Sequence, residues 1–416
     1  MEKTIQNQDN LSNKNIWLLG WTSLINDLSS EMIMPILPMF FAYLGADGFV
    51  IGILGGLREG MGNLLKIFFG YASDKIGRRK PFLLGGYISS ALMKFLLAFS
   101  NSWPMALIVA SLERIGKGMR NAPRDAMIVE TMPNQEGKGF GIHRMMDTTG
   151  AILGSSIVFF LVWKMSKIDY MHIILFSSAI AFLSVIPLFT LKEPENKKTG
   201  PNDVPALAVG LKKLSKKARR FILISSLFAL GSLSYMFFIM RIRYTSISKT
   251  GILFALGLYI FFNIVYAVFS VPLGLLFDKI GGRRTIMMGY IAMLSVVLGF
   301  AFFHPFMSWI LFALYGFSMA ALKGNQNALI GIMAEPNERG LALGTFQTLT
   351  GIAMILGNSI AGFLWKAYGI KWAFLFSSVS IILAIILMIF SWRLLNVHNF
   401  TGPVLPVNVK LSKFKK

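Results

Sequence analysis

Asp74-Lys75-Ile76-Gly77-Arg78-Arg79 returns 204 residues later as Asp278-Lys279-Ile280-Gly281-Gly282-Arg283-Arg284 in a chain of 416 residues. Each copy lies between two long apolar runs. The repeat extends beyond this motif, because Gly86-Tyr87-Ile88 recurs as Gly289-Tyr290-Ile291 at an offset of 203. A repeat of half the chain, carried by membrane-like sequence, predicts two homologous helical halves around a central site.

The composition indicates a membrane protein, since 55% of the residues are hydrophobic and only 14% are charged, against roughly 25% charged in soluble chains. Twelve apolar stretches are each long enough to cross a hydrocarbon core of about 30 Å. In lipid they must be helices, because an unpaired backbone amide costs several kcal/mol there, and they are too long and too uniformly apolar for the strands of a closed barrel. We therefore predict an all-α membrane protein of twelve transmembrane helices in two pseudo-symmetric six-helix bundles. The predicted spans are 15–44, 48–70, 81–101, 104–126, 139–164, 170–191, 220–245, 251–275, 285–303, 306–331, 341–365 and 371–394.

The polar segments divide the chain further. Residues 1–14 are expected to form a cytoplasmic tail, 15–191 the N-terminal bundle, 192–219 a cytoplasmic linker, 220–394 the C-terminal bundle and 395–416 a basic cytoplasmic tail. The net charge of +22 does not require a nucleic-acid partner, because the basic residues gather on one side of the predicted spans. That distribution predicts a multi-pass protein of the cytoplasmic (inner) membrane with both termini in the cytoplasm. The few basic residues on the outer side are Lys164, Lys167, Lys249, Lys366 and Lys371.

The loop after the second span, Gly70-x-x-x-Asp74-Lys-x-Gly77-Arg78-Arg79-Lys80, resembles the signature loop of the major facilitator superfamily. Its second copy, Gly274-x-x-x-Asp278-Lys-x-Gly-Gly-Arg283-Arg284, is similar with one extra glycine. The resemblance implies the fold of that superfamily, in its branch of drug, metabolite and siderophore carriers, and a loop that latches the two halves together at the cytoplasmic side. The positive-inside rule alone would explain the basic residues, but not an aspartate at the same place twice. The expected gating residues are Gly70, Asp74, Gly77, Arg78, Arg79, Asp278, Arg283 and Arg284.

Ionisable residues inside spans are costly and therefore point to function. The deep carboxylates lie in the N-terminal half, and a buried carboxylate can gain or lose a proton as its surroundings change. We expect proton coupling at Asp27, Glu31, Glu59 and Glu113. The alternative for the first span is that its carboxylates pair with Arg58 or Arg114 for assembly alone. Sodium coupling stays open, since Asp27 or Glu31 could bind that ion.

Basic residues exceed acidic ones at depth, and both halves supply them, because Lys323 aligns with Arg120 at the offset of 203. A pocket with spare positive charge suits an anionic substrate. The structural alternative for the fourth span is a ladder of intrahelical ion pairs, above all between Glu113 and Lys117. Arg241 lies near the predicted outer end of the seventh span, so the alternative to substrate binding is that its side chain faces solvent. The expected substrate-binding residues are Arg58, Arg114, Lys117, Arg120, Arg241, Lys323, Asn325 and Gln347.

Two further motifs resemble those of the same superfamily. Arg114 with Gly118 resembles a motif of the fourth helix in which a buried arginine is linked to proton transfer. Gly150-x-x-x-Gly154-Ser155 resembles an exporter motif of the fifth helix, but a Gly-Ser pair stands where that motif has Gly-Pro. This departure leaves the direction of transport open, and close packing of small residues explains the glycines equally well.

The sequence predicts a secondary transporter that is coupled to protons and moves a small organic anion, such as an organic acid or a siderophore, by alternating access. Within the same fold, the alternative is a multidrug efflux antiporter for lipophilic compounds. An enzyme is disfavoured, because cysteine is absent and the four histidines are widely separated. We expect no cofactor and no metal. The expected partners are the substrate, protons and the lipid bilayer, and the chain is expected to be a monomer.

Overall fold

The structure is a computed structural model that describes residues 2–132, 135–193, 214–243, 248–334 and 339–391. Over these residues the chain is helical, with turns and short loops and no strand. Parts of the expected linker and tail, residues 194–213 and 392–416, lie outside the described residues. The first helix begins at Glu2, so it includes residues that the polar composition assigned to a tail.

The N-terminal half contains the helices that correspond to the first six predicted spans. Two of these spans are broken in the structure, the first into α1 and α2 and the sixth into α7 and α8. Pro35 follows the end of α1, and Pro187 stands in the first turn of α8, where a missing amide proton costs nothing. The bounds are α1 Glu2–Ile33, α2 Leu37–Tyr43, α3 Gly48–Ile76, α4 Lys80–Ala98, α5 Trp103–Thr131, α6 Glu136–Lys164, α7 Tyr170–Leu183 and α8 Ile186–Thr190.

The C-terminal half follows the same order. Its seventh span is broken between α9 and α10, and its tenth between α13 and α14, where Gly324 adopts a φ of 90° that a residue with a Cβ rarely tolerates. The bounds are α9 Lys216–Gly231, α10 Tyr235–Arg243, α11 Lys249–Ile280, α12 Gly282–Ala301, η2 Pro305–Met307, α13 Ser308–Leu322, α14 Asn325–Met333, α15 Arg339–Tyr368 and α16 Ile370–Phe390.

Nine helical segments among the described residues are long and apolar enough to cross a membrane. The predicted spans outside this set are the first, second and fourth, formed by α1 with α2, by α3 and by α5. These three carry the ionisable residues Asp27, Glu31, Arg58, Glu113 and Arg114. Their charge is tolerated because they face neighbouring helices, and Arg58, Glu113 and Arg114 are buried.

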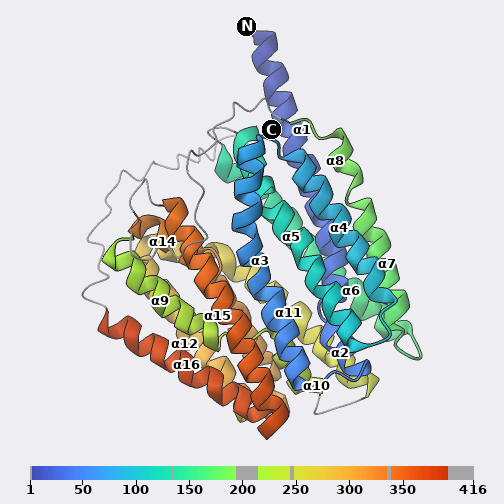
Figure 1. Cartoon of the computed structure of the whole chain (residues 1–416), viewed down its shortest axis with the longest axis vertical. Coiled ribbons are helices and arrows are strands. Elements are labelled where there is room, and N and C mark those ends of the chain that lie inside the picture. Colours follow the sequence, from blue (N-terminus) through green and yellow to red (C-terminus); the bar gives the residue numbers. More distant parts are fainter. Residues whose placement is uncertain (1, 133–134, 194–213, 244–247, 335–338, 392–416) are drawn as a thin grey trace, which may run out of the picture.

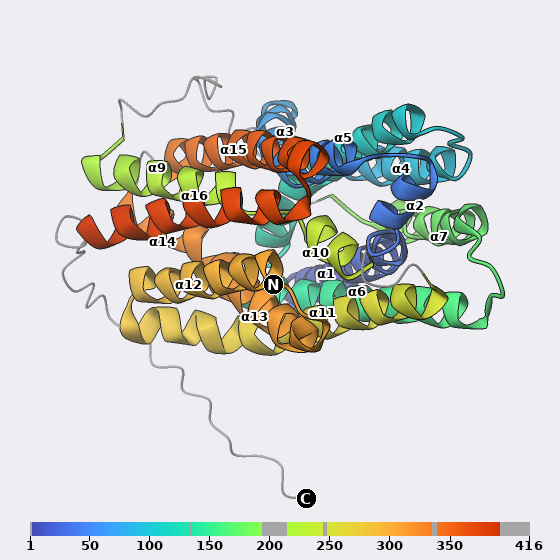
Figure 2. The same cartoon turned by 90° about the horizontal axis from the view of Figure 1, so that it is seen from below.

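The two halves stand side by side as separate bundles (Figures 1 and 2). They meet along two pairs of helices, α3 with α15 and α6 with α11. We call the end of the molecule that holds Asp74 and Asp278 the motif end, and the opposite end, which holds Asp47 and Lys366, the far end.

The halves are tightly closed at the far end. A Cβ added to Gly48 would lie 2.4 Å from the Trp365 ring, and one added to Gly52 would lie 2.4 Å from the backbone oxygen of Asn358. The close approach of α3 to α15 continues to Gly60 and is looser beyond it, since a Cβ at Gly344 would meet Ile67 at 3.7 Å. The side chains of Asp47 and Lys366 add an ion pair of 2.8 Å between the halves at this end.

Candidate functional site

A buried charge cluster in the N-terminal half centres on Glu113 of α5. Its Oε2 lies 2.9 Å from Nη2 of Arg114 and 3.6 Å from Nη1 of Arg58 on α3. Its Oε1 accepts a hydrogen bond of 2.8 Å from Ser90 of α4. The side chains of Arg58, Glu113 and Arg114 are each at most 6% exposed. The alternative of an intrahelical ion pair between Glu113 and Lys117 is therefore wrong. The carboxylate of Glu113 instead pairs with the guanidinium groups of Arg114 and of Arg58 on α3.

Lys94 of α4 belongs to the same region, although the sequence analysis did not single it out. Its Nζ donates to the Oγ atoms of Ser29 and Ser30 on α1, at 3.0 and 2.8 Å, and the residue is 3% exposed. The only signal in the sequence is one lysine within the apolar run LMKFLL. A lone basic residue there is a functional candidate by the same argument as the others.

The other basic residues of α5 lie in different surroundings. Arg120 is buried, donates to the carbonyl oxygen of Gly86 at 3.3 Å and stands 4.6 Å from the centre of the Tyr87 ring. These partners lie within the N-terminal bundle and favour a packing role for Arg120. Lys117 is half-buried and forms no ion pair with any described residue.

The carboxylates of α1 face different partners. Asp27 accepts a hydrogen bond of 3.0 Å from Asn26 and is half-buried. Glu31 accepts one of 2.8 Å from the hydroxyl of Tyr259 on α11, which joins the two halves. The alternative in which these carboxylates pair with Arg58 or Arg114 does not match this geometry, since both guanidinium groups bind Glu113. Glu59 is half-buried and has no ion pair with a described residue.

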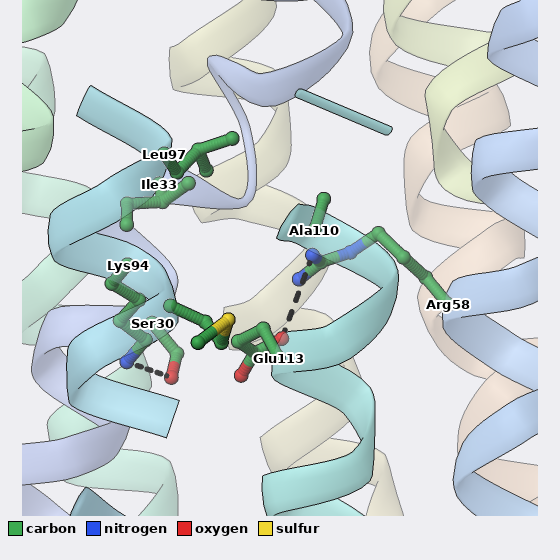
Figure 3. A pocket seen from close by; sticks show the side chains of 8 residues that line it. Ser30, Ile33, Arg58, Lys94, Leu97, Ala110 and Glu113 are labelled. Atoms are coloured by element: carbon green, nitrogen blue, oxygen red, sulfur yellow. Dashed lines mark hydrogen bonds and ion pairs between the residues drawn. The ribbon is translucent and has the colours of Figure 1, made fainter. Parts of the chain in front are cut away.

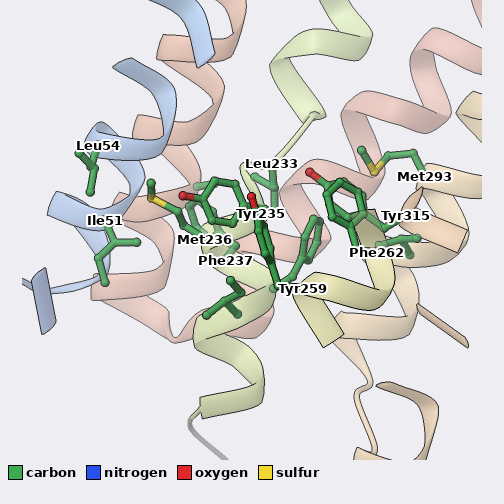
Figure 4. Close-up of a cluster of buried hydrophobic side chains, with 14 of the residues drawn as sticks. Ile51, Leu54, Leu233, Tyr235, Met236, Phe237, Tyr259, Phe262, Met293 and Tyr315 are labelled. Atoms are coloured by element: carbon green, nitrogen blue, oxygen red, sulfur yellow. The ribbon is translucent and has the colours of Figure 1, made fainter. Parts of the chain in front are cut away.

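Tyrosines of the C-terminal half reach toward α1 and α6. Tyr235 donates to the backbone oxygen of Met34 at 2.8 Å, and Tyr266 lies 3.2 Å from a guanidinium nitrogen of Arg144. Tyr235 and Tyr259 belong to a buried cluster with Phe262 and Tyr315, which Figure 4 draws together with Ile51 and Leu54 of α3 in the other half. The sequence alone does not single out these residues, because an aromatic residue within an apolar span does not reveal which half it faces.

Lys323 is the basic residue that the C-terminal half offers at depth. It stands at the break between α13 and α14, is exposed, and places its Nζ 5.7 Å from the centre of the Tyr266 ring. Glu31 lies within electrostatic reach of both Lys323 and Lys117. Neither lysine is within ion-pairing distance of Glu31, so the two act on its carboxylate only from a distance.

The remaining expected site residues of this half are spread out. Asn325 donates to the backbone oxygen of Ala321 within its own span at 3.1 Å, and Gln347 is half-buried on α15. Arg241 lies at the far end of α10, 5.7 Å from the centre of the Phe303 ring.

The first signature loop is held within its own half. Arg79 pairs with Asp74, with Ser73 at 2.8 Å and with Glu130 at the end of α5 at 2.9 Å. Burial lowers the pKa of the Arg79 guanidinium, but its hydrogen bonds to Glu130 and Asp74 outweigh burial and raise the pKa above its ordinary value. Gly77 adopts a φ of 71° where α3 ends, which explains the glycine of the motif.

The other loop residues are less involved in contacts within their half. Arg78 is exposed, and Gly70 of α3 would meet Ala122 of α5 if it carried a Cβ. In the second loop Asp278 and Arg284 are exposed and Arg283 is buried. In the part of the chain that the structure describes, no group of three or more histidine, aspartate or glutamate residues is placed to hold a metal ion.

The comparisons with known proteins agree with this architecture. The family model of the Major Facilitator Superfamily matches residues 19–330 and, in a second match, residues 239–404. An uncharacterised MFS-type transporter of Methanocaldococcus jannaschii is 46% identical over 396 residues, which cover 94% of this chain and 98% of that protein. The chain therefore belongs to the major facilitator superfamily and is a multi-pass membrane transporter, as the signature loops indicated, and not an enzyme.

More distant relatives share the fold. The multidrug resistance protein MdtH of Aeromonas salmonicida is 22% identical over 337 residues, 79% of this chain and 82% of that protein. A crystal structure of the nucleoside transporter NupG superposes with a TM-score of 0.74 at 16% identity, covering 94% of this chain and 100% of that one. The human organic anion transporter MFSD10 gives a TM-score of 0.66 at 15% identity, over 91% and 99% of the chains. These structures confirm the predicted all-helical fold of two bundles.

Proposed function

We propose that this transporter moves a small organic anion across the cytoplasmic membrane, coupled to protons, with both termini in the cytoplasm. The observation that carries the proposal is the contact of Glu31 with Tyr259 at 2.8 Å, which joins the halves in a region where Lys117 and Lys323, one from each half, act electrostatically on the same carboxylate. Neither lysine has a carboxylate within ion-pairing distance among the described residues. An acid group of a substrate would supply the missing negative charge.

Coupling is assigned to Glu31 because of its position between the halves. Its hydrogen bond to Tyr259 joins α1 to α11, and its charge competes with a substrate anion for the two lysines. A proton on Glu31 removes that competition, so proton and anion binding favour each other. Asp27 lies one helical turn away on the same face and is the second candidate for the proton. Asp27 and Glu31 also remain the candidates if the coupling ion is sodium.

The way the halves meet supports alternating access. The far end is closed by the glycine contacts of α3 with α15 and by the ion pair of Asp47 and Lys366. At the motif end Arg79 and Asp74 bind partners within their own half. This arrangement supports a transporter closed on one side, whose first signature loop would have to exchange these partners to engage the other half in the opposite state.

Multidrug efflux is the second candidate function, because the relative MdtH is a multidrug resistance protein. A cavity for lipophilic cations would be dominated by carboxylates. In this chain the half-buried carboxylates Asp27 and Glu31 stand beside the basic residues of α5 and Lys323, so the organic anion is favoured.

The experiment is uptake and efflux in proteoliposomes under an imposed pH gradient. The substrates are a panel of organic acids, siderophores, phosphate esters and cationic dyes. We expect accumulation of an organic acid by the natural chain, and Glu31→Gln is expected to keep exchange but lose gradient-driven accumulation. Transport of cationic dyes alone would contradict organic-anion transport and support multidrug efflux. Full gradient-driven accumulation by Glu31→Gln would exclude Glu31 as the coupling residue.

A further inference from the structure

A small charged cavity lies inside the N-terminal bundle, between α1, α3, α4 and α5. Figure 3 shows Lys94 and Ser30 on one side of it and Arg58 on the other, with Glu113 between them. Ile33 and Leu97 add apolar walls. The centre of a water-sized particle can occupy about 10 Å³ of this cavity, which is room for about one such particle.

The charges around this cavity do not balance. Arg58 lines the cavity, and Arg114 lies outside its lining but pairs with Glu113. Both keep their positive charges at every physiological pH, and Lys94 adds a third basic group on the lining. Among the described residues, Glu113 is the one carboxylate within ion-pairing distance of any of the three. Burying unpaired positive charge is unfavourable unless a counter-ion is near.

Several N–H groups of the cluster have no hydrogen-bond acceptor. Lys94 uses its ammonium for Ser29 and Ser30, and an ammonium has three N–H groups. The Nε atoms of Arg58 and Arg114 are buried and have no hydrogen-bond partner. The Oε1 of Glu113 accepts a hydrogen bond from Ser90, and its Oε2 forms ion pairs with both guanidinium groups but, like the two Nε atoms, is buried without a hydrogen-bond partner. The surroundings thus offer donors and positive charge, and the carboxylate is compensated.

We propose that this cavity binds one small inorganic anion of halide size between Lys94 and Arg58. The anion balances the charge of the cluster and links α1, α3, α4 and α5. Its size separates it from the proposed function, because a carboxylic acid substrate does not fit a space for about one water-sized particle. The site therefore acts on the N-terminal bundle and not on the region of Lys117 and Lys323.

The first test needs only the natural chain, purified in a gluconate buffer without halide. Chloride or bromide is titrated at constant ionic strength while thermal unfolding is followed. A ligand that binds the folded state raises the unfolding temperature in a saturable way, and we expect such a rise with both halides. A rise that does not saturate, or no rise beyond that in gluconate, would overturn the proposal.

The second test locates the ion. In crystals grown with bromide, we expect an anomalous peak in the cavity between Lys94 and Arg58, and a peak elsewhere or no peak contradicts the assignment. Lys94→Gln is expected to weaken halide affinity at least about tenfold, as loss of a charged hydrogen bond does. The control is Lys167→Gln, which removes an exposed lysine outside the cavity and should leave halide affinity unchanged. If Lys94→Gln does not fold, the natural chain and the bromide crystals still decide.

These outcomes are independent of the transport assay. Saturable halide binding without organic-anion transport would sink the proposed function and leave this site. Organic-anion transport by a chain that binds no halide would do the reverse.

Discussion

Gly52 on α3 offers a sharp test of how the far end closes. An alanine there would place its Cβ 2.4 Å from the backbone oxygen of Asn358 and 2.7 Å from Cα of Gly362, both on α15. Backbone atoms cannot rotate away as a flexible side chain can. The substitution Gly52→Ala therefore has to push α3 and α15 apart, and the cost falls only on the state in which these helices touch.

The size of the effect follows from the cost of overpacking. An inserted methyl group in a tight interface destabilises it by about 1–3 kcal/mol. Since about 1.4 kcal/mol corresponds to a factor of ten, we expect Gly52→Ala to lower the ratio of far-end-closed to far-end-open molecules by about 5- to 150-fold.

The assay uses the natural absence of cysteine. Spin labels on K167C and K371C, two exposed far-end positions in different halves, report the separation of the halves by double electron–electron resonance. Gly52→Ala should move the distribution to longer distances. The matched control is Gly62→Ala on the same helix, where an added Cβ meets nothing within 4 Å. Equal distributions for the two alanine variants would refute this account of the closure.

Three further predictions concern the polar contacts. Tyr259→Phe removes the hydrogen bond to Glu31, which is worth about 1.5–3 kcal/mol for a charged acceptor. The ratio of far-end-closed to far-end-open molecules should therefore fall about 10- to 150-fold in the same assay. The control Tyr290→Phe should not change this ratio, because the Tyr290 hydroxyl binds Ser225 and Gln326 within its own half. Arg79→Gln leaves Asp74 and Glu130 without their shared partner and should destabilise the folded chain by about 1.5–3 kcal/mol, the value of a hydrogen bond to a charged group. The measurement is thermal unfolding against the exposed control Arg78→Gln, and equal unfolding temperatures would show that the network is not structural. Partial burial raises the pKa of Asp47, but the ammonium of Lys366 and the backbone amide of Val50 outweigh it, so the pKa lies below its ordinary value. An ion pair that lowers a carboxyl pKa is fully formed above the ordinary pKa and is lost only as the pH falls through the lowered pKa. Lys366→Gln should therefore lower the ratio of far-end-closed to far-end-open molecules by less than about fivefold, and by the same factor from about pH 8 to about pH 5. An effect that vanishes within this pH range would contradict the assignment.

Most of the fold could be predicted from the sequence, because helix length and hydrophobicity are set by the bilayer. The repeat of the signature loops, with Asp74 matched by Asp278, indicated two related halves. The break after α1 was not among the predictions, although Pro35 explains it, since proline cannot continue the helix. The breaks at 232–234 and at Gly324 were not predicted. A serine pair or a lone glycine inside an apolar run has no unique effect on a helix.

The pairing of charges could be predicted far less well. Helical spacing placed Lys117 near Glu113, but in the structure Glu113 forms ion pairs with Arg58 and Arg114. Which residues of different helices meet depends on how α3 and α5 are rotated against each other, and the sequence of one helix carries no record of that. Arg120 illustrates the same limit, since its contact with Tyr87 comes from the packing of α5 on α4.

The most direct test of the account is counterflow exchange of organic acids in proteoliposomes without any imposed gradient, because it measures substrate recognition apart from coupling. The natural chain and the surface control Lys167→Gln should exchange an organic acid at equal rates. Lys117→Gln and Lys323→Gln should each lose at least about tenfold, since each removes one charged contact to the anion. Exchange at the natural rate by both lysine variants, or exchange of lipophilic cations alone, would contradict the claim that two opposed lysines bind an anion.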